Sequence, residues 1–185
     1  MAPGERGIHG RARSIDDSAG LRRRAVVRAI ILAAGQGTRL APATDDRPKC
    51  LVELGGLSLL DRQLSTFKSL GITDIAVIGG YRAESITPHG FQLIVNPDFA
   101  SSNMVHTLFC GRDLMVGDSD LIIAYGDIIY EPKVIRALVA SDGPLSVVVD
   151  REWRRFWELR MADPLSDAET MKIDSQGMIT ELGKT

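Results

Sequence analysis

A glycine-containing stretch near the N-terminus has the composition of a phosphate-binding loop. The short apolar run at residues 29–32 leads directly into the sequence AAGQG at residues 33–37, a pattern that indicates a buried strand followed by a turn. Because glycine has no side chain, backbone N–H groups in such a turn can approach phosphate oxygens and donate hydrogen bonds to them. The Lys-Ser or Lys-Thr pair of a Walker loop does not follow, and the third glycine of a dinucleotide-binding loop is missing. We therefore predict a phosphate-binding loop of another kind.

Two basic residues follow this loop and are predicted to be catalytic. Arg39 comes directly after Gly37-Thr38, and Lys49 follows Pro48. The planar guanidinium of Arg39 offers several donors to the β and γ phosphates of a nucleotide, whereas Lys49 is a point charge that can follow the transferring or leaving phosphate. Both cations would stabilise negative charge in a transition state.

An aspartate at the end of a later apolar run is the candidate metal ligand. Residues 121–125 form this run, and Gly126-Asp127 follows it. In open parallel sheets ligands bind at the carboxyl ends of the strands, so Asp127 should face the same crevice as the glycine loop. Mg²⁺ binds one or two carboxylates together with phosphate oxygens and water, which suits a single aspartate. The alternative role is a helix cap, but Pro132 already marks the start of the next helix.

The residues around the glycine loop resemble a known superfamily. The sequence LAAGQGTRLAP at residues 32–42, followed by Pro48-Lys49, is similar to the signature L-A-A-G-x-G-T-R-L, a short gap and P-K. This signature belongs to the nucleotidyltransferases that include sugar-1-phosphate nucleotidylyltransferases and phosphocholine cytidylyltransferases. The resemblance covers about residues 28–185 and implies an α/β fold, a Rossmann-like three-layer α/β/α domain with a mostly parallel mixed sheet.

The resemblance also implies which residues bind the nucleotide and the metal. The glycine loop would hold the triphosphate, the family's G-D motif makes Asp127 the Mg²⁺ ligand, and the loop after Asn96-Pro97 would approach the base. For Ser102 a simple helix cap is the alternative. The expected nucleotide-binding residues are Ala33, Ala34, Gly35, Gly37, Thr38, Gly80, Ser102 and Asn103.

Three later segments, at residues 125–132, 147–153 and 163–169, are most similar to the phosphocholine and phosphonate cytidylyltransferase branch. Aromatic and acidic side chains in this region could form a box for an ammonium head group. Tryptophans that serve only in packing are the alternative. By resemblance Lys184 would bind the acceptor's phosphate, although a lysine so near the end could equally be a surface residue. The expected acceptor-binding residues are Tyr130, Asp150, Trp153 and Lys184.

These expectations together describe a Mg²⁺-dependent nucleotidyltransferase. The acceptor's phosphate or phosphonate oxygen would attack the α-phosphorus of a nucleoside triphosphate, CTP by resemblance, and pyrophosphate would leave. One alternative is a sugar-1-phosphate nucleotidylyltransferase. Another is a non-catalytic nucleotide-binding module, because family members carry a second metal-binding aspartate on a late strand that this sequence lacks. We accordingly expect a domain that is truncated at its C-terminus.

A repeating β-α-β rhythm supplies the elements that must position these residues. Apolar residues recur at helical spacing from Leu60 to Leu70, and Gly71 ends that helix. Further helices are expected near residues 102–114 and from Pro132. Strands are expected at residues 29–32, 75–78, 91–95, 121–125 and 145–149, with a hairpin formed by residues 171–173 and 178–180.

Bulk properties exclude several classes of protein. With 185 residues, 44% hydrophobic residues and a net charge of −2, the chain suits one globular domain at residues 28–185 and no nucleic-acid partner. Its apolar runs are far shorter than the roughly 20 residues of a membrane span. Cys50 and Cys110 lack metal-site spacing, which favours reduced thiols and a cytoplasmic protein. Residues 1–27 are predicted to be a flexible tail, and a homodimer is compatible with these properties.

Overall fold

The computed structural model describes residues 26–166 and 168–183, which form two units divided after Tyr130. Each unit is described by itself. Almost all of the predicted tail at residues 1–27, and also Lys184, lie outside the described residues.

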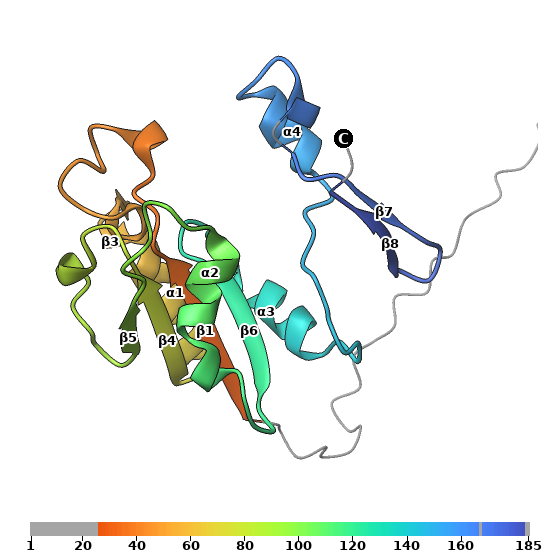
Figure 1. Ribbon diagram of the computed structural model, residues 1–185. Helices are drawn as coiled ribbons and strands as arrows, with labels where there is room; N and C mark the ends of the chain where they lie inside the picture. The colour runs from red at the N-terminus through yellow and green to blue at the C-terminus, as the bar shows by residue number, and fades with distance from the viewer. Residues whose placement is uncertain (1–25, 167, 184–185) are drawn as a thin grey trace, which may run out of the picture. The chain divides into compact units, whose positions relative to one another are not determined.

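A four-stranded parallel sheet forms the centre of the first unit, in the order β5-β4-β1-β6 (Figure 1). Its strands are β1 (Val27–Ala33), β4 (Asp74–Gly79), β5 (Gln92–Val95) and β6 (Asp120–Tyr125). Ala33 pairs with Gly79 and Leu32 pairs with Tyr125, so three strands end at a common rim. All four strands were predicted, and their carboxyl ends face the same edge because they run in parallel.

Two helices lie on opposite faces of this sheet (Figure 1). Helix α1 (Leu59–Ser69) buries Leu60, Leu64 and Phe67, at the spacing that predicted it. The Ser58 hydroxyl caps its first turn by accepting a hydrogen bond of 3.0 Å from the Asp61 backbone N–H. On the other face, Leu108 of helix α2 (Met104–Cys110) packs against the buried cluster of residues 30, 76 and 78. The predicted three-layer arrangement around a parallel sheet is therefore confirmed.

Short elements fill the loops of the first unit. They are η1 (Thr38–Leu40), η2 (Lys49–Leu51), β2 (Glu53–Leu54), β3 (Leu57–Ser58), η3 (Ala83–Ser85) and η4 (Arg112–Leu114). The antiparallel hairpin β2-β3 was not predicted, although Gly55 and Gly56, with φ angles of 60° and 79°, are a hairpin signal. The single helix predicted near residues 102–114 is interrupted at Gly111, where α2 ends and η4 begins.

The second unit contains helices α3 (Pro132–Val139) and α4 (Trp153–Glu158), the turn η5 (Pro164–Ser166) and an antiparallel pair, β7 (Met171–Ile173) and β8 (Ile179–Leu182). The helix from Pro132 and the hairpin were predicted correctly. The strand predicted at residues 145–149 was wrong, because this segment has no regular structure and pairs with no described strand. Its β-branched residues favour extended backbone, but a strand also needs a hydrogen-bonded neighbour. Among the described helices, none has the length and apolar character to cross a membrane.

Candidate nucleotide-binding site

The glycine loop follows β1 at the rim of the sheet, as the sequence predicted. Gly37 has a φ angle of 77° and precedes η1, so the chain turns sharply there. The side chain of Thr44, which is fully buried, donates a hydrogen bond of 3.0 Å to the Gly37 carbonyl oxygen and fixes the turn. Gly35 is exposed and has open space where a side chain would be. A phosphate could therefore approach the backbone at Gly35 without steric hindrance.

Lys49 packs directly on this loop. A methyl group added at Gly37 would lie 2.8 Å from both Cβ and Cδ of Lys49, so only glycine leaves room for the lysine's aliphatic stem. Pro48, fully buried, sets the extended backbone that precedes η2 and brings Lys49 to this position. The predicted phosphate-binding turn and the predicted catalytic lysine thus lie in contact.

Asp127 completes the arrangement from the end of β6. The Gly126 N–H donates a hydrogen bond of 2.8 Å to the Leu32 carbonyl oxygen, and a methyl group at Gly126 would lie 3.0 Å from the Cβ atom of Ala33. Glycine therefore lets the end of β6 approach the start of the glycine loop. The Asp127 carboxylate accepts a hydrogen bond of 2.5 Å from the Lys49 ammonium group. Residues 78 positions apart in the sequence meet as a charged pair at the rim.

The donor set at this rim suits Mg²⁺ bound together with a nucleotide. The Asp127 side chain is 39% exposed and already binds one cation, the Lys49 ammonium group. Within the described part of the chain, no three His, Cys, Asp or Glu side chains gather closely enough to hold a metal ion by themselves. One accessible carboxylate with room for phosphates and water is the way in which proteins commonly bind Mg²⁺. Asp127 therefore fits the predicted role.

Other predicted residues take up positions near the loop. Gly80 is buried against it, because a methyl group there would lie 2.8 Å from the Ala34 carbonyl oxygen. The next residue, Tyr81, donates its backbone N–H to the same oxygen and its hydroxyl group to the Asp45 carbonyl oxygen, at 2.9 and 2.8 Å. Gly80 thus allows the end of β4 to hold the loop in place. Thr38 and Arg39 are exposed on η1, beside the loop.

The loop before α2 is organised by a buried asparagine that the sequence reading missed. Asn96 is fully buried, and its amide group donates hydrogen bonds to the hydroxyl oxygens of Ser102 (3.0 Å) and Thr107 (2.9 Å). The Asn103 side chain caps α2 by accepting a hydrogen bond of 3.0 Å from the His106 N–H. The cap belongs to Asn103 instead of Ser102, whose role as a base ligand stays a prediction. Asn96 within the Asn-Pro turn was the available signal.

Tyr130 has its hydroxyl group directed at α1. Its hydroxyl donates a hydrogen bond of 3.1 Å to Oε1 of Gln63, and its ring contacts Phe67 edge-on at 6.2 Å. Burial raises the pKa of the Tyr130 phenol above its usual value, which keeps it protonated. The structure therefore gives Tyr130 a packing and hydrogen-bonding role, and its contact with an acceptor stays a prediction.

The other acceptor candidates belong to the second unit. The Asp150 carboxylate accepts a hydrogen bond of 2.9 Å from the Glu152 N–H, just before α4. The Trp153 and Trp157 rings meet edge-on at 6.2 Å, and the guanidinium groups of Arg154 and Arg160 lie 5.0 and 5.2 Å from their respective centroids. Each ring therefore makes a cation–π contact with an arginine of the same segment, and the predicted box for an ammonium group stays a prediction. Arginines supply the cations here, and a bound ammonium group would have to compete with them.

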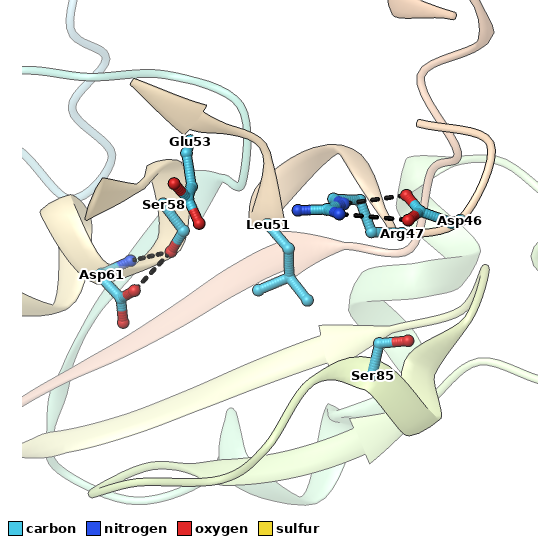
Figure 2. A pocket seen from close by; sticks show the side chains of 7 residues that line it. All are labelled: Asp46, Arg47, Leu51, Glu53, Ser58, Asp61 and Ser85. Carbon is cyan, nitrogen blue, oxygen red and sulfur yellow. Dashed lines mark hydrogen bonds and ion pairs between the residues drawn. The ribbon is translucent and has the colours of Figure 1, made fainter. Parts of the chain in front are cut away.

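A hollow of about 400 Å³ is lined in part by Leu51 of η2 (Figure 2). It contains none of the predicted site residues, and three of its side chains are carboxylates, which would repel a triphosphate. One of them, Asp46, bonds Arg47 at 2.9 and 3.1 Å, which lowers the pKa of its carboxyl group. The lining residues are Asp46, Arg47, Leu51, Glu53, Ser58, Asp61 and Ser85. The glycine loop is therefore the better candidate for nucleotide binding.

Comparisons with known proteins identify relatives of this chain. The chain is 42% identical over 165 residues to the CTP:phosphoglutamine cytidylyltransferase of Campylobacter jejuni, covering 84% of this chain and 65% of that protein. It is 39% identical over 91 residues to the choline-phosphate cytidylyltransferase of Streptococcus pneumoniae, covering 47% and 40%. The chain thus spans less than two thirds of the length of these relatives.

A solved structure shares the fold. A nucleotidyl transferase from Methanothermobacter thermautotroptrophicus superposes with a TM-score of 0.51 at 22% identity, covering 62% of this chain and 56% of that one. The family model of the MobA-like NTP transferase domain matches residues 29–175, a stretch that contains the glycine loop, Lys49 and Asp127. From the site and from this match, the chain belongs to the MobA-like NTP transferase domain family.

Proposed function

We propose that this chain transfers a cytidylyl group from CTP to a small phosphorylated or phosphonate acceptor and releases pyrophosphate. The observation that carries the proposal is the position of Lys49, whose stem packs on Gly37 while its ammonium group bonds Asp127 at 2.5 Å. A phosphate-binding turn, a cation and a carboxylate are thereby assembled at the rim of a parallel sheet, where ligands of such sheets bind. The similarity to the two cytidylyltransferases named above supports CTP as the nucleotide.

The proposed reaction is a single displacement. An oxygen of the acceptor's phosphate or phosphonate forms a bond to the α-phosphorus of CTP, while the bond from that phosphorus to the bridging oxygen of the β-phosphate breaks. The bonding electrons leave with pyrophosphate, and no covalent enzyme intermediate forms. Backbone N–H groups of the glycine loop hold the triphosphate, and Lys49 and Arg39 stabilise the charge that develops on the phosphates.

Mg²⁺ would be held by Asp127 together with the triphosphate, where it would neutralise charge and orient the α-phosphate. Asp127 contributes the one carboxylate that the family's G-D motif implies. The Gly126 hydrogen bond to Leu32 keeps this carboxylate close to the phosphate-binding loop.

The proposal is tested by measuring pyrophosphate release from each of the four nucleoside triphosphates with Mg²⁺. Phosphoglutamine, phosphocholine, 2-aminoethylphosphonate and glucose-1-phosphate serve as acceptors, and a chelator is the control. We expect release with CTP and with one of the first three acceptors, and none with the chelator. Release only with glucose-1-phosphate would indicate a sugar nucleotidylyltransferase. Nucleotide binding without release from any pair would show a non-catalytic module.

A further inference from the structure

Gln63 is a buried polar side chain with no part in the function proposed above. It lies on α1 among the apolar residues that face the sheet, and its side chain is 1% exposed. Its amide nitrogen donates a hydrogen bond of 2.8 Å to the Tyr125 carbonyl oxygen. Its amide oxygen accepts a hydrogen bond of 3.1 Å from the Tyr130 hydroxyl group. A leucine could fill this place in an apolar core, so packing alone does not explain why an amide side chain is found here.

The two partners of Gln63 flank the loop that carries Asp127. Tyr125 is the last residue of β6, and Tyr130 follows the loop at residues 126–129. Asp127, Ile128 and Ile129 are exposed, so packing does not hold them. One amide group therefore ties both ends of a loop, of which residues 127–129 are exposed, to a helix of the core.

The chemistry of the amide matches both of its partners. A carbonyl oxygen can only accept a hydrogen bond, and the amide NH₂ group donates one. The Tyr130 hydroxyl donates in turn to the amide oxygen, and its edge-on contact with Phe67 holds the ring in place. Displacing either end of the loop would leave a buried polar group without a partner, which is costly.

We propose that Gln63 and Tyr130 are positioning residues, which hold the Asp127 loop so that its carboxylate meets both Lys49 and the metal–nucleotide complex. The role of Asp127 in this inference rests on the proposed function, whereas the restraint on its loop does not. Residues that orient a metal ligand commonly change metal affinity by about tenfold or more when they are replaced.

The test uses the full chain with Tyr130→Phe, which keeps the ring and removes only the hydroxyl group, and Gln63→Met, which keeps the approximate length and removes the amide. Thr66→Val is the matched control, because the Thr66 hydroxyl bonds Arg62 within α1 and away from the loop. Hydrogen exchange at residues 126–129 is measured first. CTP binding is then titrated with Mg²⁺ by calorimetry, and unfolding in urea is followed in parallel.

We expect faster exchange at residues 126–129 in Tyr130→Phe and Gln63→Met but not in Thr66→Val. The Mg²⁺ concentration for half-maximal CTP binding should rise about tenfold, while CTP binding in a chelator stays unchanged. Equal hydrogen-exchange rates at residues 126–129 in all variants would overturn the positioning role of Gln63 and Tyr130. Lower stability of the variants with an unaltered Mg²⁺ requirement for CTP binding would overturn it too. A third outcome combines faster exchange in the two variants with CTP binding to the unsubstituted protein that does not depend on Mg²⁺. It would retain the restraint on the loop and overturn the role of Asp127 in metal binding.

Discussion

Replacing Gly37 by alanine should destabilise the protein and disturb the Lys49–Asp127 pair. With a φ angle of 77°, Gly37 is in the left-handed region, which costs alanine about 1–2 kcal/mol. The added methyl group would lie 2.8 Å from Cβ of Lys49, and such overpacking costs about 1–3 kcal/mol. Alanine also makes the unfolded chain less flexible than glycine does, which offsets about 0.4–1 kcal/mol of these costs. The free energy of unfolding should therefore fall by about 1–5 kcal/mol.

Urea denaturation of the full chain measures this loss, with Gly35→Ala as the matched control. Gly35 has no atom within 4 Å of the added methyl group, so its replacement should change stability by less than about 0.5 kcal/mol. Gly35→Ala should instead weaken CTP binding, because its methyl group stands where phosphate would approach the loop. Equal stability of the two variants would refute the described conformation of the turn.

A second background tests the steric part of this argument. Lys49→Ala removes two of the three lysine atoms that lie closest to the added methyl group. Gly37→Ala should then cost less in the Lys49→Ala background than in the unsubstituted protein, by about 0.5 kcal/mol or more. Strict additivity would show that Lys49 does not pack on Gly37.

Three further predictions follow from single features. Lys49→Ala should lower kcat/KM for pyrophosphate release by about 10²–10³-fold. It should change the free energy of unfolding by less than about 1 kcal/mol, because the ion pair of Lys49 with Asp127 is partly exposed. A loss of stability that accounts for the whole rate effect would contradict the proposed role. Burial raises the pKa of Cys50 from 9.0 to about 12, so the folded state should lose stability as the pH rises from 9 toward 12, by up to about 1.4 kcal/mol per pH unit. In urea titrations at pH 8–10, below the range in which the raised pKa of Tyr130 adds a slope of its own, Cys50→Ala should reduce this slope while Cys110→Ala retains it. Gly80→Ala brings a methyl group within 2.9 Å of three atoms and should cost about 1–3 kcal/mol of unfolding free energy, and an unaltered thermal midpoint would argue against the tight contact.

The sequence predicted the sheet well because its signals are local. Strand β1 contains the apolar run at residues 29–33, which ends at a glycine loop, and helix α1 begins at a serine cap and ends before Gly71. The position of Asp127 beside the glycine loop was also predictable, since parallel strands place their carboxyl ends at one edge, but its ion pair with Lys49 was not predicted. The segment at residues 145–149 failed for the opposite reason, because strand formation depends on a neighbour that local sequence does not reveal.

Buried polar side chains were the residues that sequence reasoning missed. Gln63 and Asn96 look like ordinary surface residues in the sequence, yet both are almost fully buried and fully hydrogen-bonded. The partners of Gln63 lie 62 and 67 positions away, so no short pattern could indicate its role, whereas the Asn-Pro turn was a local signal for Asn96. The acceptor-binding residues stay predictions, because Asp150 and Trp153 belong to the second unit and Lys184 lies outside the described residues.

The ion pair between Lys49 and Asp127 has a consequence for the order in which ligands can bind. A free divalent cation would compete with the ammonium group for the carboxylate and would leave the lysine without a counter-charge. A bare triphosphate would draw the lysine away and leave the carboxylate facing an anion. A metal–triphosphate complex carries both charges, so each residue exchanges its partner for a new one in the same event. Under the proposed function, this ion pair should favour the metal–triphosphate complex over either of its components.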